Sequence, residues 1–290
     1  MQASTAFPIA LLLICLGLPV QAASNTGPEP LSPKDGPISL FNGRDLDGLY
    51  TWLNDAKHED PRPVFAVRDG MLCISGDGMG YICTNQSYRD YHLIIEFRWG
   101  ERTWGSRTRA AKDSGVIVHC TGPDGGYEGI FMAGIEAQMI QGGTGDFIVV
   151  SGKNADGSPV LCSLTAETTT DRDGETVWRA GGEKKTVQGG RINWYGRDPD
   201  WEDRLGFRGR EDVESPDREW TRMDVVCEGA TIAILVNGVV VNRAFDVSPA
   251  AGKILVQSEL AEVEVRRLEL WPLGKAPAAR GGAGGALPRS

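Results

Sequence analysis

One stretch of the chain carries a carboxylate and an amide at the spacing of a strand. In residues 134–140, Glu136 and Gln138 alternate with apolar residues. Side chains alternate between the faces of a strand, so one face would be apolar core and the other would present both polar groups, about 7 Å apart. Gly134 on the polar face leaves room for a ligand. Glu136 could therefore act as a general base and Gln138 as a sugar contact, the alternative being a solvated sheet face.

The same stretch lacks the second carboxylate that conventional glycoside hydrolysis requires. A retaining glycosidase uses two carboxylates about 5 to 5.5 Å apart, one as nucleophile and one as acid. Here Gln138 occupies the second position, and the strand contains neither E-x-D nor E-x-x-x-E. This pattern argues against direct displacement at an unmodified glycosidic carbon. A conventional glucanase is the weaker alternative, and a second acid near Glu136 across the sheet would revive it.

Further candidates lie at strand ends and in aromatic loops. His119 ends an apolar segment before a glycine-rich loop, where site residues often lie, and could serve as an acid or an orienting group. Two aromatic loops, the first over 98–113 and the second over 193–201, combine aromatic rings with guanidinium or amide groups, which suits stacking on sugar rings and bonding to hydroxyls. Their candidate contacts are Arg98, Trp104, Asp113, Trp194, Tyr195 and Arg197. Either loop could instead cap the core.

The elements that must position these residues are strands. The chain has 38 Gly and 16 Pro, and no long run has helical periodicity, so turn-rich β-structure is expected. Asn237-Gly238 between two apolar runs predicts a hairpin with a type I′ turn. Strand-length segments are expected at 64–67, 71–74, 92–99, 115–120, 135–140, 147–150, 222–227, 231–236, 239–242, 254–257 and 263–271. Together they predict an all-β sandwich of the jelly-roll type.

The ends of the chain differ in composition from its middle. An apolar run over residues 7–20, followed by small residues, predicts a signal peptide over 1–22 and hence an exported, periplasmic or extracellular protein. Residues 23–35 are expected to be a linker, 36–273 the folded domain and 274–290 a disordered tail. No later segment is apolar enough for a membrane span.

The net charge limits the classes of binding partner, and the number of cysteines limits how many disulfides can form. The formal net charge is −9, with no basic stripe, which argues against nucleic-acid binding. Without the signal peptide five cysteines are left, an odd number, so at least one is unpaired in a monomer. Cys73 and Cys83 could meet across a hairpin, and the alternative is buried free thiols.

Several motifs in order resemble the 3-keto-disaccharide hydrolase family. They are Leu40-Phe-Asn-Gly-Arg-Asp-Leu-Asp-Gly48, Asp113-Ser-Gly-Val-Ile-Val-His119, Gly134-Ile-Glu-Ala-Gln138, Leu235-Val-Asn-Gly238 and Gly252-Lys-Ile-Leu-Val-Gln-Ser258. The similarity covers essentially all of 36–273. It implies a concanavalin A-like sandwich of two curved antiparallel sheets, with a sugar bound on the concave face, and activity on 3-keto-glycosides.

The resemblance also implies a chemistry for Glu136. A ketone at C3 acidifies the proton on C2, so one base can abstract it and expel the C1 substituent, after which water adds. A sugar 3-oxidoreductase would supply such a substrate. Related keto-sugar lyases suggest a divalent metal ion, although the sequence shows no metal-ligand spacing and identifies no ligands. A lectin-like carbohydrate-binding module is the alternative from another class, because the same sandwich serves binding without turnover.

Overall fold

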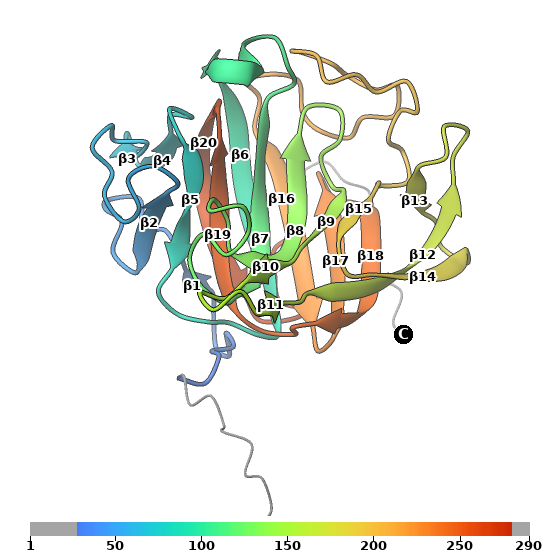
Figure 1. Ribbon diagram of the computed structural model, residues 1–290, viewed down its shortest axis with the longest axis horizontal. Coiled ribbons are helices and arrows are strands. Elements are labelled where there is room, and N and C mark those ends of the chain that lie inside the picture. The colour runs from blue at the N-terminus through green and yellow to red at the C-terminus, as the bar shows by residue number, and fades with distance from the viewer. Residues whose placement is uncertain (1–27, 280–290) are drawn as a thin grey trace, which may run out of the picture.

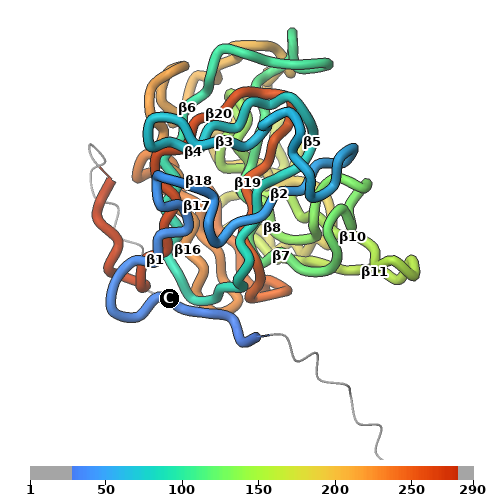
Figure 2. Tube along the Cα trace, turned by 90° about the vertical axis from the view of Figure 1, so that its left-hand side faces the viewer, coloured from blue at the N-terminus to red at the C-terminus, as the bar shows by residue number. Residues whose placement is uncertain are grey.

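Two antiparallel β-sheets pack face to face in the computed structural model, which describes residues 28–279. Figure 2 shows the two layers from the side, and in Figure 1 the smaller sheet lies in front of the larger one. The predicted all-β sandwich of two curved antiparallel sheets is confirmed. Within residues 28–279 the one helical element is a short 3-10 turn, η1 (Gly105–Thr108).

The larger sheet has eleven strands. Its main path runs β13-β12-β18-β17-β16-β6-β20-β4-β3, with β1 beside β20 and β14 beside β12. The strands are β1 (Ile38–Ser39), β3 (Phe65–Arg68), β4 (Met71–Ile74), β6 (Tyr91–Thr103), β12 (Ser163–Thr170), β13 (Thr176–Trp178), β14 (Glu183–Val187), β16 (Thr221–Glu228), β17 (Thr231–Val236), β18 (Val239–Ser248) and β20 (Ala261–Trp271).

The smaller sheet has seven strands in the order β15-β9-β8-β7-β19-β5-β2. They are β2 (Leu49–Leu53), β5 (Met79–Thr84), β7 (Asp113–Thr121), β8 (Ala133–Ile140), β9 (Phe147–Val150), β15 (Gly190–Ile192) and β19 (Lys253–Glu259). A separate two-stranded ribbon joins β10 (Gly152–Lys153) and β11 (Pro159–Val160).

The hairpin predicted at Asn237-Gly238 is confirmed. Val236 pairs with Val239, and Asn237 and Gly238 have φ of 48° and 84°, as a type I′ turn requires. The hydrophobic core lies between the sheets, and it includes Ile135, Ala137 and Met139 of β8. The alternation predicted for residues 134–140 is therefore correct, and the polar face of β8 points away from the core.

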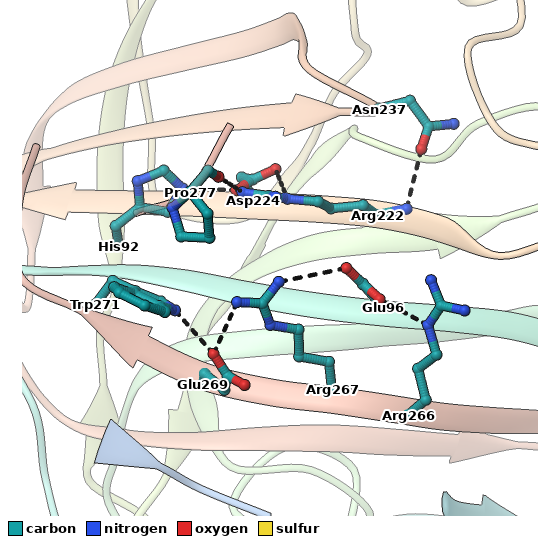
Figure 3. A network of polar contacts seen from close by, with 10 residues as sticks. All are labelled: His92, Glu96, Arg222, Asp224, Asn237, Arg266, Arg267, Glu269, Trp271 and Pro277. Carbon is teal, nitrogen blue, oxygen red and sulfur yellow. Dashed lines mark hydrogen bonds and ion pairs between the residues drawn. The ribbon is translucent and has the colours of Figure 1, made fainter. Parts of the chain in front are cut away.

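The outer face of the larger sheet is a network of ion pairs (Figure 3). Glu96 of β6 accepts from Arg266 at 2.7 Å, and His92 lies 2.6 Å from Asp224. Burial opposes ionisation of Asp224, but hydrogen bonds from His92 and Arg222 hold its pKa below the usual value. Charged side chains paired across neighbouring strands thus make this face of the sheet polar.

The segments that flank the sandwich are attached to it where the structure describes them. Leu31 pairs with Tyr88, and the hydroxyl of Ser32 donates to the carbonyl of Arg89 at 2.7 Å, so part of the predicted linker lies against the domain. Pro277, in the predicted tail, accepts from Arg222 at 2.8 Å. The predicted signal peptide lies outside the described residues. In residues 28–279 no helix is long and apolar enough to cross a membrane.

The hairpin suggested for Cys73 and Cys83 is wrong. Cys73 lies in β4 of the larger sheet and Cys83 in β5 of the smaller one, because the glycine-rich connection crosses between the sheets. Gly76 in this connection has φ of 78°, and a Cβ there would meet the backbone of Ala261 at 2.6 Å. The five cysteines in the described part of the chain are free thiols.

Candidate active site

Three neighbouring strands of the smaller sheet, β8, β7 and β19, build a polar pocket on the face turned away from the core. Gly115 lies opposite Gln138, and Ile117 lies opposite both Glu136 and Leu255. Residues opposite each other share a face, so Gln257, two residues beyond Leu255, continues the row of Gln138 and Gly115. Strand register thus gathers one carboxyl and two amide side chains.

Gly115 is the floor of this pocket. A Cβ at position 115 would lie 2.2 Å from Oε1 of Gln257 and 2.4 Å from Oε1 of Glu136, closer than real Cβ contacts allow. Both side chains therefore converge above the backbone of β7, and only a residue without a side chain leaves them that space. The polar atoms of two strands meet here because the strand between them contributes glycine.

Two further acids, Asp113 and Glu259, extend the pocket. Asp113 begins β7 and is buried, and Glu259 ends β19. Nε2 of Gln138 donates to Oδ1 of Asp113 at 2.8 Å, and Arg107 of η1 forms an ion pair with the other carboxylate oxygen. Arg107 is itself held by Asp203 at 2.9 Å. Both carboxylate oxygens of Asp113 thus have partners, which hold this group in a fixed position in the pocket.

Burial and mutual repulsion separate the pKa values of these acids. Glu136 is 4% exposed, and burial, reinforced by the charge of Asp113, raises its pKa to about 8 against the pull of Arg191. Burial raises the pKa of Asp113 to about 6, and the charges of Arg107 and Arg191 oppose this rise. Burial, with the charges of Asp113 and Glu136, raises the pKa of Glu259 well above its usual value. Asp113 therefore ionises before Glu136.

Two amide oxygens in the pocket lack partners. Oε1 of Gln138 and Oε1 of Gln257 are buried and accept no hydrogen bond from the described residues. Buried polar atoms are normally paired, so these acceptors are suited to the hydroxyl groups of a ligand. Tyr127 lies at the rim with 37% of its surface exposed, close enough for the charges of Glu136 and Glu259 to raise its pKa further, after burial and Glu128.

Of the residues singled out in the sequence, Glu136, Gln138 and Asp113 come together in this pocket, which we call the acid pocket. His119 does not join them. Its φ of 55° lies at a register shift in β7, and its ring packs edge-on against Tyr91 of the opposite sheet at 6.1 Å. Nδ1 lies 2.9 Å from the carbonyl oxygen of Pro249, and burial lowers the pKa to about 4. His119 is a neutral core residue, because the irregular backbone turns its side chain inward.

Arg98 and Trp104 also lie elsewhere. Arg98 points outward from the larger sheet, where it pairs with Glu264 and stacks on Trp220 at 4.7 Å. Alternation explains its position, since its neighbours Phe97 and Trp99 face the core. Trp104 donates to the carbonyl of Ser75 at 2.9 Å. Neither residue shares the acid pocket, so the first aromatic loop contributes Asp113 and, unexpectedly, Arg107.

The second aromatic loop mainly braces the core. Trp194 is buried in the core, and Arg197 is buried against Asp146 with its guanidinium 4.3 Å from the ring of Trp201. Tyr195 is exposed and packs beside Trp178 at the edge of the sandwich. These three residues were predicted to contact the sugar in one site, but the structure does not bring them to Glu136.

Four residues of the pocket were missed in the sequence: Gln257, Glu259, Arg107 and Arg191. The first two could have been found, because alternation along 253–259 places Leu255, Gln257 and Glu259 on one face. Arg191 lies opposite Ile148, which lies opposite Glu136, and its Nη1 bonds Asp146 at 2.9 Å. No local pattern indicates this position or that of Arg107, because both depend on contacts distant along the chain.

As they are placed, the side chains of the pocket do not form a site for a divalent metal ion. Both oxygens of Asp113 are engaged, and within residues 28–279 no group of three or more His, Cys, Asp or Glu side chains is arranged to hold a metal. No step of the reaction is therefore assigned to a metal ion.

The chain is similar to a known protein family and to several solved structures. The model of the 3-keto-alpha-glucoside-1,2-lyase-like domain matches residues 36–270. No curated protein matches the chain. A proposed glycosyl hydrolase from Parabacteroides distasonis ATCC 8503 is 17% identical, with 82% of this chain and 94% of that chain covered and a TM-score of 0.47.

Two other solved structures are similar to a lesser degree. A carbohydrate-binding module from Bacillus subtilis is 10% identical, with 77% of this chain and 94% of that chain covered and a TM-score of 0.43. A β-glucanase from Bacillus licheniformis is 13% identical, with 81% and 97% covered and a TM-score of 0.40.

Proposed function

The chain belongs to the 3-keto-alpha-glucoside-1,2-lyase-like family and is carbohydrate-active, and from this premise we propose that it cleaves the glycosidic bond of 3-keto-glycosides by elimination and hydration. The observation that carries the proposal is the set of buried acids with separated pKa values around Gly115. Acids and bases of unequal pKa, held within one pocket, are what a stepwise proton transfer requires.

In the proposed elimination, the ionised carboxylate of Glu136 takes the proton from C2. The electron pair forms the C1–C2 double bond by way of the enolate of the C3 ketone, and the C1–O bond breaks. Glu259, whose pKa is raised well above its usual value, donates its proton to the departing oxygen. Arg191 supplies positive charge near the developing enolate, since its charge already lowers the pKa of Glu136.

Hydration reverses these proton transfers. Glu259, now ionised, removes a proton from water as the oxygen of that water adds to C1, and Glu136 returns its proton to C2. The open acceptors of Gln138 and Gln257 would orient the hydroxyl groups of the sugar throughout. The enzyme ends in its starting protonation state. In this proposal a sugar 3-oxidoreductase supplies the 3-keto substrate. The protein is exported from the cell, a proposal that rests on the apolar run at residues 7–20.

The pH profile tests these roles. Glu136 must be ionised to act as base, and its pKa is raised to about 8, so kcat/KM is expected to rise with pH through that region. It should fall again at higher pH as Glu259 loses its proton, and Glu259→Gln should remove that falling limb. The measurement is kcat/KM from pH 5 to 10. A profile that is flat between pH 6 and 9 would contradict the assignment.

The proposed reaction is tested by incubating the purified protein with a 3-keto-glucoside and with its unoxidised parent. Aglycone release and exchange of the C2 proton for deuterium are followed with and without a chelator. We expect release from the keto-sugar alone, with C2 exchange, and no effect of the chelator. Binding without release would favour the lectin-like alternative, and loss of activity with chelator would show that a metal ion takes part.

A conventional glycosidase is the second candidate, and the structure adds an observation in its favour. The second acid that Glu136 lacks on its own strand is supplied by Asp113 and Glu259 on neighbouring strands. The same incubation separates the two reactions, because a conventional glycosidase would release the aglycone from the unoxidised parent and would not exchange the C2 proton.

A further inference from the structure

Two adjoining cavities lie at the edge of the sandwich, where β12, β13 and β14 extend beyond the smaller sheet (Figure 1). The smaller cavity has a volume of about 370 Å³ and is lined by Thr169, Val177, Trp178, Arg179, Ala180 and Tyr195. The larger one, about 820 Å³, shares Thr169, Arg179 and Ala180 with it. Neither is lined by a residue of the acid pocket, so this is a separate place on the molecule.

An aromatic platform forms one wall of the smaller cavity. The rings of Trp178 and Tyr195 lie 6.1 Å apart at 54°, and Tyr195 rests edge-on against the buried ring of Trp194 at 5.3 Å. Tyr195 is nevertheless 45% exposed. A large ring that is braced from behind and open in front presents a rigid apolar face, which suits stacking on the C–H face of a sugar.

The fold holds this platform in place. The backbone N–H of Trp178 donates to the carbonyl of Asn193 at 2.8 Å, and Val177 forms a bridge with Asn193. This contact ties the short edge strand β13 to the segment that follows β15, so the two rings come from different sheets. Their relative position is therefore set by the sandwich and not by one flexible loop.

The remaining lining is polar and mainly basic. The guanidinium of Arg179 is exposed and forms no ion pair within the described part of the chain. The larger cavity adds Lys185, whose Nζ donates to Oγ1 of Thr176 at 2.8 Å, and Lys184, whose Nζ lies 5.1 Å from the ring of Phe245. Against them stand Glu183 in the lining and Glu167, whose carboxylate accepts from the N–H of Gly181, in a protein whose net charge is −9. Threonine hydroxyls along β12 supply donors and acceptors. Local positive charge beside an aromatic face favours a hydroxylated ligand that carries carboxylate groups.

We propose that these cavities form a second carbohydrate site, which binds an oligosaccharide containing uronic acid units. The ring of one unit stacks on Tyr195 and Trp178, and Arg179 pairs with a carboxylate. The volume of each cavity lies in the range of ordinary ligand pockets and exceeds what one side chain would fill. The site does not depend on the proposed reaction, because its ligand needs no keto group and does not enter the acid pocket.

Binding of an oligogalacturonate, and of a neutral cello-oligosaccharide of equal length, to the full chain tests the site by calorimetry. We expect the acidic chain to bind more tightly, with affinity falling about tenfold or more in Tyr195→Ala and in Arg179→Ala. Both side chains are exposed, so these variants should fold. Trp178→Ala removes the second ring of the platform and should also weaken binding of the acidic chain.

Two variants serve as controls. Leu161→Ala removes an exposed apolar side chain that does not line either cavity, and Glu136→Gln alters only the acid pocket. Both should bind the acidic chain as the wild type does. Equal affinity for the neutral chain would overturn the assignment to uronic acid units. Absence of binding, or full binding by Tyr195→Ala and Arg179→Ala, would overturn the site itself.

Discussion

Glu136→Gln is expected to reduce turnover of a 3-keto-glycoside by about 10²–10⁴-fold, because an amide cannot accept the C2 proton. The amide has nearly the shape of the carboxyl group, so substrate affinity should change little. Steady-state and single-turnover kinetics measure the effect. Glu228→Gln, at an exposed position at the end of β16, is the matched control and should retain wild-type turnover. Unchanged activity in Glu136→Gln would remove Glu136 from the mechanism.

The same variant is expected to be more stable than the wild type at alkaline pH. The folded-state pKa of Glu136 is raised to about 8 from a usual value of 4.5, so its contribution to stability is present below 4.5 and is lost as pH rises through 8. Glutamine carries no such penalty. The gain in the free energy of unfolding should approach a few kcal/mol at about pH 8–9 and vanish near pH 4. Urea unfolding across this range measures it.

A gain at high pH together with lost turnover would show that burial of Glu136 serves the reaction at a cost to stability. Equal stability of variant and wild type at pH 8–9 would instead mean that the carboxyl is solvated in solution. This comparison does not depend on knowing the substrate, so it tests the electrostatics of the pocket separately from the proposed reaction.

Gly115→Ala is expected to lower kcat/KM by about 100-fold while the fold persists. The added methyl would occupy the point on which Oε1 of Glu136 and Oε1 of Gln257 converge, at 2.4 Å and 2.2 Å. Both are ends of flexible side chains, and Gly115 does not have a positive φ, so the chain can accept alanine by moving them aside. A displacement of about 1 Å in a reacting group is enough for this loss.

Gly189→Ala is the matched control for Gly115→Ala. A Cβ at position 189 would meet nothing within 4 Å, so activity and melting temperature should be those of the wild type. Thermal unfolding and kcat/KM are measured on both variants. Full activity in Gly115→Ala would mean that the convergence of Glu136 and Gln257 is irrelevant to turnover.

Local patterns were enough to predict the parts of the site that lie on one strand. Alternation along β8 placed Glu136 and Gln138 on the face away from the core, and Asn237-Gly238 identified the turn between β17 and β18. The same reasoning applied to β19 would have added Gln257 and Glu259. For these residues the periodicity of an extended backbone is itself the physical cause of their position.

Other predicted site residues do not reach the acid pocket, because their positions depend on the backbone or on distant partners. His119 turns into the core at an irregular point of β7, where φ is 55°. Arg197 is taken up by Asp146, and Tyr195 joins Trp178 from the opposite sheet. An aromatic loop in a sequence has no fixed direction, since what surrounds it decides whether its rings face a ligand or the core.

The sequence by itself determined eleven of the twenty strands, the polar face of β8, and the family to which the chain belongs. Only the tertiary structure decided that β7 and β19 place Asp113 and Glu259 beside Glu136, and that Arg107 and Arg191 face them. The reason is that alternation is a local property of the backbone. Strand order and burial, which separate the pKa values of these acids, arise from contacts between residues far apart in the chain.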